Sequence, residues 1–337
     1  MDIDSDKQLE HISLMKKRFP AKEEFIKRIE ELLGKEEAEI FFKICYTDTP
    51  NSIRCNTLKI DCGNLRKRLE NYGWKINQPF DKYPEIMIVE NTTPGEIGKS
   101  KEHLLGYFYV QEISSMLPIL VLDPKPNESL LDLCASPGSK TTQAASLMEN
   151  KGVIIANEVN LGRVGILNSN LERCGVTNTI VTRKEGVSFC NILLKKTNFK
   201  FDKILVDAPC TGEGTLRKSP KTFLIWNLNM IKKISSIQKR LASNALKLLK
   251  VGGTMIYSTC TLAPEENEFI IDYLIKNFDI EIQKINLPLK FREGVNCFNG
   301  VCLSENVKNC LRLYPQDNDT DGFFVTKIKK LSERGCE

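Results

Sequence analysis

Two cysteines are the residues whose type and placement in this sequence most directly suggest chemistry. Cys210 lies in FDKILVDAPCTGEGTLRK, and Cys260 lies in GTMIYSTCTLAPEENE. Each follows an apolar run that reads as a buried parallel strand, and ligands of open α/β sheets bind at the carboxyl ends of the strands. Two thiols at that edge could face one substrate, so that one sulfur attacks and the other moves a proton. A buried cysteine is more often a small hydrophobic residue, but the polar loops around both sulfurs favour the chemical interpretation.

A second group of residues indicates a site for a nucleoside. The segment LLDLCASPGSKTTQ reads as a strand, a tight loop and a helix start, and Gly138 lets the backbone turn there. Glu158 ends the next strand, where a carboxylate can accept hydrogen bonds from both ribose hydroxyls. Glu185 and Asp207, which end the third and fourth strands, would line the same crevice. The alternative is a purely structural turn between a strand and a helix.

The glycine pattern of the loop narrows the class of cofactor. The loop lacks GxGxxG, which argues against a dinucleotide, and it lacks GxxxxGK[ST], which argues against a nucleoside triphosphate. S-adenosylmethionine has one nucleoside and needs no pyrophosphate cradle, so it fits this loop best.

A parallel sheet is needed to bring these residues together. From residue 129 onward, strands alternate with helices, which predicts an α/β fold with helices on both faces of the sheet. We expect strands at 130–134, 153–157, 179–182, 203–207 and 254–259. We expect helices at 141–148, 161–174, 187–195, 229–249 and 264–277. The later segments DIEIQKI and GFFVTKIKK are expected to add an antiparallel pair.

The N-terminal third has a mixed α+β pattern. Helical spacing or strand-like runs occur at 23–33, 36–45, 51–60, 64–72 and 85–90, followed by a strand and a helix within 106–122. The turn-rich segment DPKPN suggests a domain boundary, which predicts an N-terminal domain at 1–125 and a second domain at 126–332. Residues 106–122 could also pack on the second domain.

Composition limits the class of protein. Hydrophobic residues make up 41% and charged residues 27% of 337, with a net charge of +5, as in ordinary globular proteins. No apolar run is long enough for a membrane span and the first residues lack a secretory pattern, so we expect a cytoplasmic protein. The 12 cysteines are irregularly spaced, which favours reduced thiols, and the cluster of Cys297, Cys302 and Cys310 fits no standard zinc pattern. We therefore expect no metal. Two histidines, remote from nucleophile-like motifs, argue against a histidine triad.

Three blocks in this chain resemble those of a known family. DLCASPGSKTTQ, DAPCTGEGTLRK and YSTCTLAPEENE are similar, in this order, to the signature blocks of the Nop/Sun (RsmB-type) family of RNA cytosine-C5 methyltransferases. RCNTLK, GYFYVQEISSM and RLYPQDNDTDGFFVTKI resemble its flanking blocks, so that the resemblance covers about residues 50–330. It implies a Rossmann-like class I methyltransferase sheet with a smaller N-terminal α+β RNA-binding domain, and S-adenosylmethionine as the cofactor.

The resemblance also implies roles for individual residues. Cys260 becomes the nucleophile that adds to C6 of cytosine, and Cys210 assists product release. Lys140 and Asp207 are implied to contact the target base. The residues implied to hold S-adenosylmethionine are Cys134, Ala135, Ser136, Pro137, Gly138, Ser139, Lys140, Glu158, Arg163, Glu185 and Asp207. The chain departs from the family at the Ser-Pro-Gly-Ser loop, at Glu185 and at Gln316, but no departure removes a group that the chemistry requires.

RNA is the substrate that the resemblance implies. A compact two-domain enzyme of this length favours tRNA, with ribosomal RNA as the alternative, and the N-terminal domain would clamp the RNA. We expect the protein to be a monomer. Basic residues expected near the site could hold phosphates, namely Arg54, Arg66, Lys67, Arg68, Arg217, Lys218 and Lys221. Two other classes stay open. A catalytically idle RNA-binding assembly factor is disfavoured because both cysteines are present, and a dithiol oxidoreductase is disfavoured because the dinucleotide glycines are missing.

Overall fold

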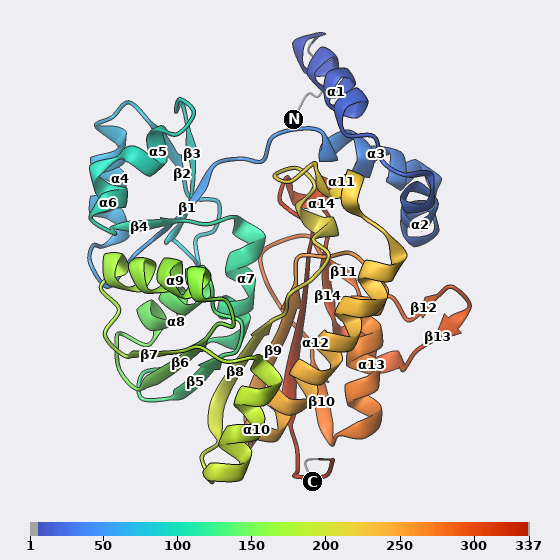
Figure 1. The fold of residues 1–337 in the computed structure, drawn as a ribbon. Coiled ribbons are helices and arrows are strands. Elements are labelled where there is room, and N and C mark those ends of the chain that lie inside the picture. Colours follow the sequence, from blue (N-terminus) through green and yellow to red (C-terminus); the bar gives the residue numbers. More distant parts are fainter. Residues whose placement is uncertain (1–5, 336–337) are drawn as a thin grey trace.

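A large mixed sheet forms the body of the molecule and carries both cysteine segments (Figure 1). The computed structural model describes residues 6–335. Within that range the sheet has nine strands in the order β11-β14-β15-β9-β8-β5-β6-β7, with β10 paired to β15. Their bounds are β5 Ser129–Asp132, β6 Val153–Asn157, β7 Thr179–Thr182, β8 Phe201–Asp207, β9 Leu249–Thr259, β10 Ile280–Gln283, β11 Arg292–Glu293, β14 Leu311–Leu313 and β15 Phe323–Lys330.

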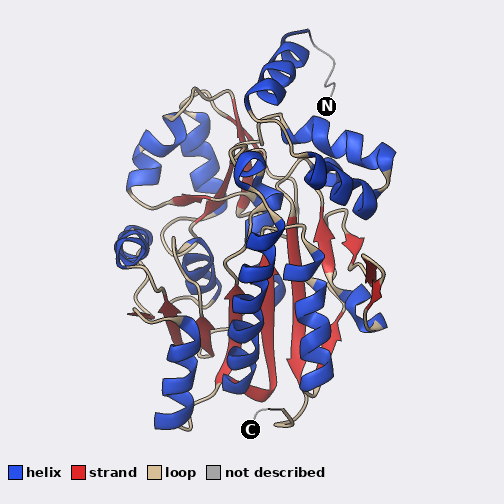
Figure 2. Ribbon diagram, turned by 45° about the vertical axis from the view of Figure 1, so that its right-hand side comes forward, coloured by secondary structure: helices blue, strands red, loops and turns tan. Residues whose placement is uncertain are grey.

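Helices lie on both faces of this sheet, as Figure 2 shows. Those that follow the parallel strands are α8 Ser139–Leu147, α9 Leu161–Cys174, α10 Gly186–Lys196, α12 Leu228–Leu248 and α13 Glu268–Asn277. The predicted α/β alternation is confirmed. The predicted antiparallel addition at the C-terminal side is confirmed as well, because β15 pairs antiparallel with both β10 and β9.

The strands at the centre of the sheet are apolar on both faces, as expected for buried parallel strands. In β8, Ile204 and Val206 pack into the core under α10, α12 and α13, whereas Leu205 packs into the core on the side of α7 (Ile113–Leu122) and α8. Met255 and Ile256 divide in the same way in β9. This period of two fixes which residues at the strand ends point to which side of the sheet.

The helix predicted at 264–277 is interrupted. A short 3₁₀ helix, η2 (Pro264–Glu266), precedes α13, and Asn267 stands between them with non-helical dihedral angles. The Asn267 side chain accepts a hydrogen bond from the Thr259 hydroxyl at 2.6 Å and donates one to the Thr261 carbonyl at 3.0 Å. The break therefore ties the start of α13 to the loop that contains Cys260.

A second, four-stranded antiparallel sheet lies beside the large one, in the order β2-β3-β1-β4. Its elements are β1 Ser52–Cys55, α4 Cys62–Glu70, β2 Lys75–Asn77, β3 Ile86–Glu90, α5 Glu96–Lys99, α6 Lys101–Leu104 and β4 Phe108–Val110. The strand predicted at 51–60 is shorter than expected. Helix α7 follows β4 but packs on β8, β9 and β15, so that the chain passes into the larger unit near residue 113.

The first three helices belong to neither sheet. They are α1 Asp6–Arg18, α2 Glu23–Leu33 and α3 Lys35–Cys45, and they pack against α11 Thr222–Ile225. Aromatic contacts make this junction, because the Phe25 ring lies 5.9 Å from that of Phe223 and 5.1 Å from that of Trp226. The N-terminal third thus contains these three helices and, after them, the elements of the small sheet.

Two further contacts fix the C-terminal part. Glu268 and Arg312 form a fully buried ion pair at 2.5 and 2.6 Å, which joins α13 to β14. Cys297 and Cys302 form a disulfide across the hairpin of β12 (Cys297–Phe298) and β13 (Val301–Cys302), so the prediction of reduced thiols is wrong for this pair. The irregular spacing of the cysteines in the sequence did not indicate this bond, because the two sulfurs meet only through the turn of the hairpin. Cys310 is buried elsewhere.

Within residues 6–335, no helix has the length and apolarity to span a membrane, and no cluster of three potential metal ligands occurs.

Candidate active site

The two cysteines meet because their strands are neighbours. β8 and β9 are parallel, and Asp207 pairs in register with Ser258. The chain leaves the sheet just beyond each of these residues, which brings Cys210 and Cys260 to the same edge with their sulfur atoms 3.2 Å apart. The structure thus brings together the two thiols singled out from the sequence.

The environment distinguishes the two sulfurs. The hydrogen bond to Cys260 and burial raise the pKa of the Cys210 thiol well above its ordinary value, and the nearby carboxylate of Glu266 adds to the shift. Cys210 therefore keeps its proton at neutral pH. Because its thiol can donate that proton in a hydrogen bond, Cys210 is suited to stabilise negative charge on the sulfur of Cys260.

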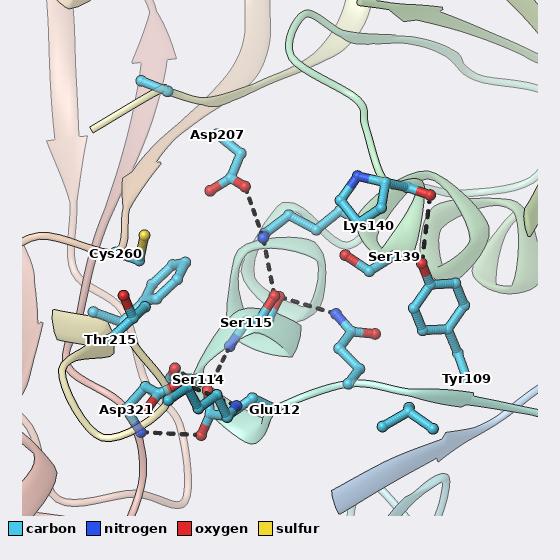
Figure 3. A pocket seen from close by; sticks show the side chains of 16 residues that line it. Tyr109, Glu112, Ser114, Ser115, Ser139, Lys140, Asp207, Thr215, Cys260 and Asp321 are labelled. Atoms are coloured by element: carbon cyan, nitrogen blue, oxygen red, sulfur yellow. Dashed lines mark hydrogen bonds and ion pairs between the residues drawn. The ribbon is translucent and has the colours of Figure 1, made fainter. Parts of the chain in front are cut away.

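A lysine and an aspartate line the same cavity as Cys260 (Figure 3). The Lys140 Nζ, from the first turn of α8, lies 2.8 Å from the carboxylate of Asp207 and donates to the Ser115 Oγ at 3.0 Å. The Ser258 hydroxyl donates to the other Asp207 oxygen at 2.7 Å. Lys140 and Asp207 are therefore held as a donor and acceptor pair at the edge of the sheet.

Two cavities share the wall formed by Asp207, Ala208 and Cys260. The first, of about 420 Å³, we call the cofactor cavity; it is lined by Cys134, Ser136, Glu158, Arg163, Glu185 and Cys210, among others. The second, of about 290 Å³, we call the base cavity; it is lined by Tyr109, Glu112, Ser115, Lys140, Lys218, Asp321 and Phe323, among others. Two reactants could therefore approach each other at this wall from opposite sides.

The lining of the cofactor cavity fits a nucleoside with a cationic end. Glu158 is 3% exposed, and its carboxylate accepts the Asn160 N–H at 2.9 Å and faces Arg163 at 3.4 Å. Asp132 lies under the Pro-Gly loop, where it lines a smaller cavity of about 210 Å³ with Asp207. One of its carboxylate oxygens accepts from Thr141, while the other is buried without a partner. An unsatisfied carboxylate there suits a positively charged ligand group.

Most residues predicted for the cofactor lie at this cavity, each held by its own element. Gly138 adopts a left-handed conformation with a φ of 99° and begins α8. Glu185 caps α10 by accepting from the N–H groups of Val187 and Ser188, so that its carboxylate is partly committed to the helix. Of the other loop residues predicted for the cofactor, Ala135, Pro137, Ser139 and Lys140 line the smaller cavity, whereas Gly138 lines neither.

Comparison with known proteins places this arrangement in a family. Residues 119–329 match the family model of the 16S rRNA methyltransferase RsmB/F, and residues 22–113 match that of the N-terminal domain of 16S rRNA methyltransferase RsmF. The chain belongs to the RsmB/F methyltransferase family. The resemblance inferred from the cysteine and loop blocks is confirmed.

Individual relatives of this RsmB/F methyltransferase are named for different RNAs. It is 40% identical over 313 residues to the tRNA (cytosine(49)-C(5))-methyltransferase of Pyrococcus abyssi, covering 92% of this chain and 98% of that protein. It is 38% identical over 294 residues to ribosomal RNA small subunit methyltransferase F of Vibrio cholerae, covering 87% of this chain but only 60% of the relative.

Solved structures support the family assignment over nearly the whole chain. A methyltransferase homolog protein from Pyrococcus horikoshii is 38% identical with a TM-score of 0.82, covering 95% of this chain and 99% of the other. The crystal structure of NSun6 from Pyrococcus horikoshii with SFG is 25% identical with a TM-score of 0.78, covering 92% and 98%. The class I methyltransferase fold expected from the sequence is thus present.

Some of the basic residues expected at the surface of this RsmB/F methyltransferase are buried instead. Arg54 donates to the Ser139 carbonyl and to Thr142, and so joins the small sheet to α8. Arg217 donates to Thr47 and pairs with Asp319 at 2.7 Å. The prediction that these two arginines hold phosphates is wrong, because their guanidinium groups are used to connect segments far apart in the sequence. Lys218 does line the base cavity, where it pairs with Asp321.

Sequence reasoning missed two carboxylates of the base cavity, Glu112 and Asp321. The Asp321 N–H donates to Glu112, and the Lys218 Nζ lies 3.0 Å from the Asp321 carboxylate. Burial raises the pKa of both carboxyls, and the pairing with Lys218 opposes this shift. The signal was present, since both lie in blocks that resemble the family, GYFYVQEISSM and TDGFFVTKI, but local spacing could not show that they meet.

Proposed function

We propose that this methyltransferase makes 5-methylcytosine in RNA through a covalent bond between Cys260 and C6 of the target base, with S-adenosylmethionine as methyl donor. The observation that carries the proposal is the pair of sulfur atoms 3.2 Å apart at a wall shared by two cavities. Cytosine C5 is a weak nucleophile, and attack of a thiolate at C6 makes it reactive. A site with one attacking sulfur and one protonated sulfur suits that chemistry.

The residues that would hold S-adenosylmethionine are those of the cofactor cavity and the loop above it. When bound, this group supplies a methyl group on a positively charged sulfur. Glu158 would accept hydrogen bonds from the ribose hydroxyls, and Asp132 and Asp207 would face the cationic end. Glu185 would lie near the adenine. Arg163, at 3.4 Å from Glu158, would hold that carboxylate in place.

The reaction at the target base would use the groups of the base cavity. Cys260 Sγ forms a bond to C6, and the displaced electron pair moves through C5 toward N3. Lys140 would contact the N3 edge and stabilise that negative charge, while Asp207 would accept a hydrogen bond from the N4 amino group. After C5 has gained a methyl group, its proton leaves to a base and the C6–S bond breaks, which restores Cys260 as a thiolate. The thiol of Cys210 would assist by donating a hydrogen bond to the departing sulfur.

We favour tRNA as the substrate. The relative named for tRNA is matched over 98% of its length, whereas the chain spans only 60% of the relative named for ribosomal RNA. The family model is nevertheless named for 16S rRNA, so ribosomal RNA is the second candidate. The target cytosine has to be unpaired or flipped out to reach the base cavity. The small sheet with α4 would clamp the RNA, and the protein would act as a monomer in the cytoplasm.

Transfer of labelled methyl groups to RNA tests this function. The purified protein is incubated with labelled S-adenosylmethionine and separate pools of unmodified tRNA and ribosomal RNA, and the products are mapped by bisulfite sequencing. We expect label at C5 of cytosine, mainly in the tRNA pool. An idle assembly factor would transfer no label and would form no adduct with RNA that contains 5-fluorocytosine. Label on another atom or base would contradict the proposed chemistry.

A further inference from the structure

A buried carboxylate that lines neither cavity connects the loop that contains Cys210 to the loop that contains Cys260. Glu266, in η2, is fully buried, and its Oε2 accepts the backbone N–H of Thr211 at 3.0 Å. The Thr211 hydroxyl donates to Glu266 Oε1 and lies 2.9 Å from the hydroxyl of Thr261. Thr211 directly follows Cys210, and Thr261 directly follows Cys260. One carboxylate therefore reaches the residue after each sulfur.

A helix on the core side completes the connection. The Gln238 side chain, in α12, donates to Glu266 Oε2 at 2.9 Å and to the carbonyl of Pro209, just before Cys210, at 2.8 Å. The Tyr257 hydroxyl donates to the Glu266 carbonyl at 2.6 Å. Both loops are thus connected to α12 and β9 through one buried network.

The network lies outside the substrate space. Thr211, Thr261, Gln238 and Glu266 are buried, and other described residues form the linings of the cofactor cavity and the base cavity. These four side chains therefore have no route to the base or the cofactor in this structure. Any effect on the reaction has to pass through the positions of the two sulfurs.

We infer that Glu266, acting through the hydroxyls of Thr211 and Thr261, is a positioning residue that sets the separation and facing of the Cys210 and Cys260 sulfurs. The inference rests on the proposed function for the roles of the sulfurs. The contacts support it: the Thr211 hydroxyl donates to Glu266 Oε1 and lies 2.9 Å from the Thr261 hydroxyl, which also reaches Glu266 Oε1 at 3.4 Å. Loss of either hydroxyl would remove the link between the two threonines, while the Thr211 N–H would still reach Glu266.

The test measures how well the two sulfurs face each other without RNA or cofactor. The protein is equilibrated with mixtures of reduced and oxidised glutathione, in which two protein thiols and one glutathione disulfide give one protein disulfide and two glutathione thiols. Alkylation and peptide mass mapping then report the fraction bonded between Cys210 and Cys260. The equilibrium constant gives the effective concentration of one thiol at the other.

Thr211→Val and Thr261→Val keep the side-chain shape but remove the hydroxyl link. We expect each to lower this effective concentration about tenfold, the scale for losing one buried hydrogen bond. Thr211→Ser and Thr261→Ser, which keep the hydroxyl, should return it to within about twofold of the unmodified protein. Melting curves check that all four variants are folded. With RNA, Thr211→Val should release product more slowly and accumulate covalent adduct, because Cys210 no longer faces the departing sulfur.

Either of two results would overturn the inference. One is an effective concentration in both valine variants equal to that of the unmodified protein. The other is a loss that the serine variants share, since the hydroxyls would then not be the link. Because glutathione exchange needs neither RNA nor S-adenosylmethionine, these results are independent of whether the protein methylates RNA, and failure of the proposed function would instead appear as absent methyl transfer by the unmodified protein.

Discussion

Replacement of Glu158 by Gln probes the cofactor site most sharply. The Glu158 carboxylate is 3% exposed, lines the cofactor cavity, and has its own fixed partners in the Asn160 N–H and Arg163. Gln has nearly the same shape but carries no charge and has one acceptor oxygen fewer. One charge-assisted hydrogen bond to a ribose hydroxyl is lost, which costs about 1–3 kcal/mol. The dissociation constant of S-adenosylhomocysteine should therefore rise about 5- to 150-fold.

Isothermal titration calorimetry with S-adenosylhomocysteine measures this change directly. Glu96→Gln is a matched control, because the Glu96 carboxylate also accepts hydrogen bonds from a backbone N–H and a side chain but lies in the small sheet domain. It should leave the affinity within about twofold of the unmodified protein. An unchanged affinity in Glu158→Gln, with a folded protein, would mean that the ribose does not contact this carboxylate and that the cofactor site has been placed wrongly.

Three other perturbations test charge, pH and packing. Joint replacement of Arg66, Lys67 and Arg68 by Ala should lower RNA affinity and flatten its salt dependence without changing cofactor affinity. Filter binding at several salt concentrations measures the RNA affinity. An unaltered salt slope would mean that RNA does not contact α4. Burial lowers the pKa of His103 in the folded protein below its ordinary value of 6.5. Above pH 6.5 the side chain is neutral in both states, and the protein keeps its full stability. As the pH falls from 6.5 through the lower pKa of the folded state, the unfolded chain binds the proton more readily, so the free energy of unfolding decreases. Urea unfolding at about pH 8 and about pH 5 should thus show a smaller difference in the free energy of unfolding for His103→Gln than for the unmodified protein. An equal difference in both proteins would mean that His103 does not cause it. Arg312→Met leaves a buried carboxylate unpaired and should lower the free energy of unfolding by about 3–5 kcal/mol in urea, whereas a loss below about 1 kcal/mol would contradict the contribution of that pair.

The parallel part of the fold could be predicted from the sequence because its signals are local. Apolar runs of strand length, each followed by a turn and an amphipathic segment, locate β5 to β8 and their helices closely, whereas β9 begins earlier and α13 later than predicted. Cys210 and Cys260 each follow such a run, and parallel neighbours end at the same edge. Their meeting therefore followed from topology alone, as did the placing of Glu158 at the end of β6.

The rest of the site depends on contacts between distant segments. Asp321 reaches the base cavity because β15 pairs antiparallel with β9, where Phe324 lies opposite Thr259, and this register has no local signature. Glu112 arrives from the junction between the two sheets. In the sequence, Arg54 cannot be distinguished from an arginine that binds phosphate. Only its hydrogen bonds to Ser139 and Thr142 show that it connects two parts of the fold. Burial of a charged side chain is a tertiary property that sequence pattern does not carry.

The most direct test of the account is the pattern of covalent adducts formed by two single variants. If Cys260 attacks C6 and Cys210 serves the later elimination, Cys260→Ala should form no bond to RNA and show no turnover. Cys210→Ala should attack and transfer the methyl group but stall before release, which leaves protein linked to RNA as a slowly migrating band on a denaturing gel. The double variant should show no band. A band with Cys260→Ala and none with Cys210→Ala would reverse the assignment, and bands with neither would contradict a mechanism that uses both thiols.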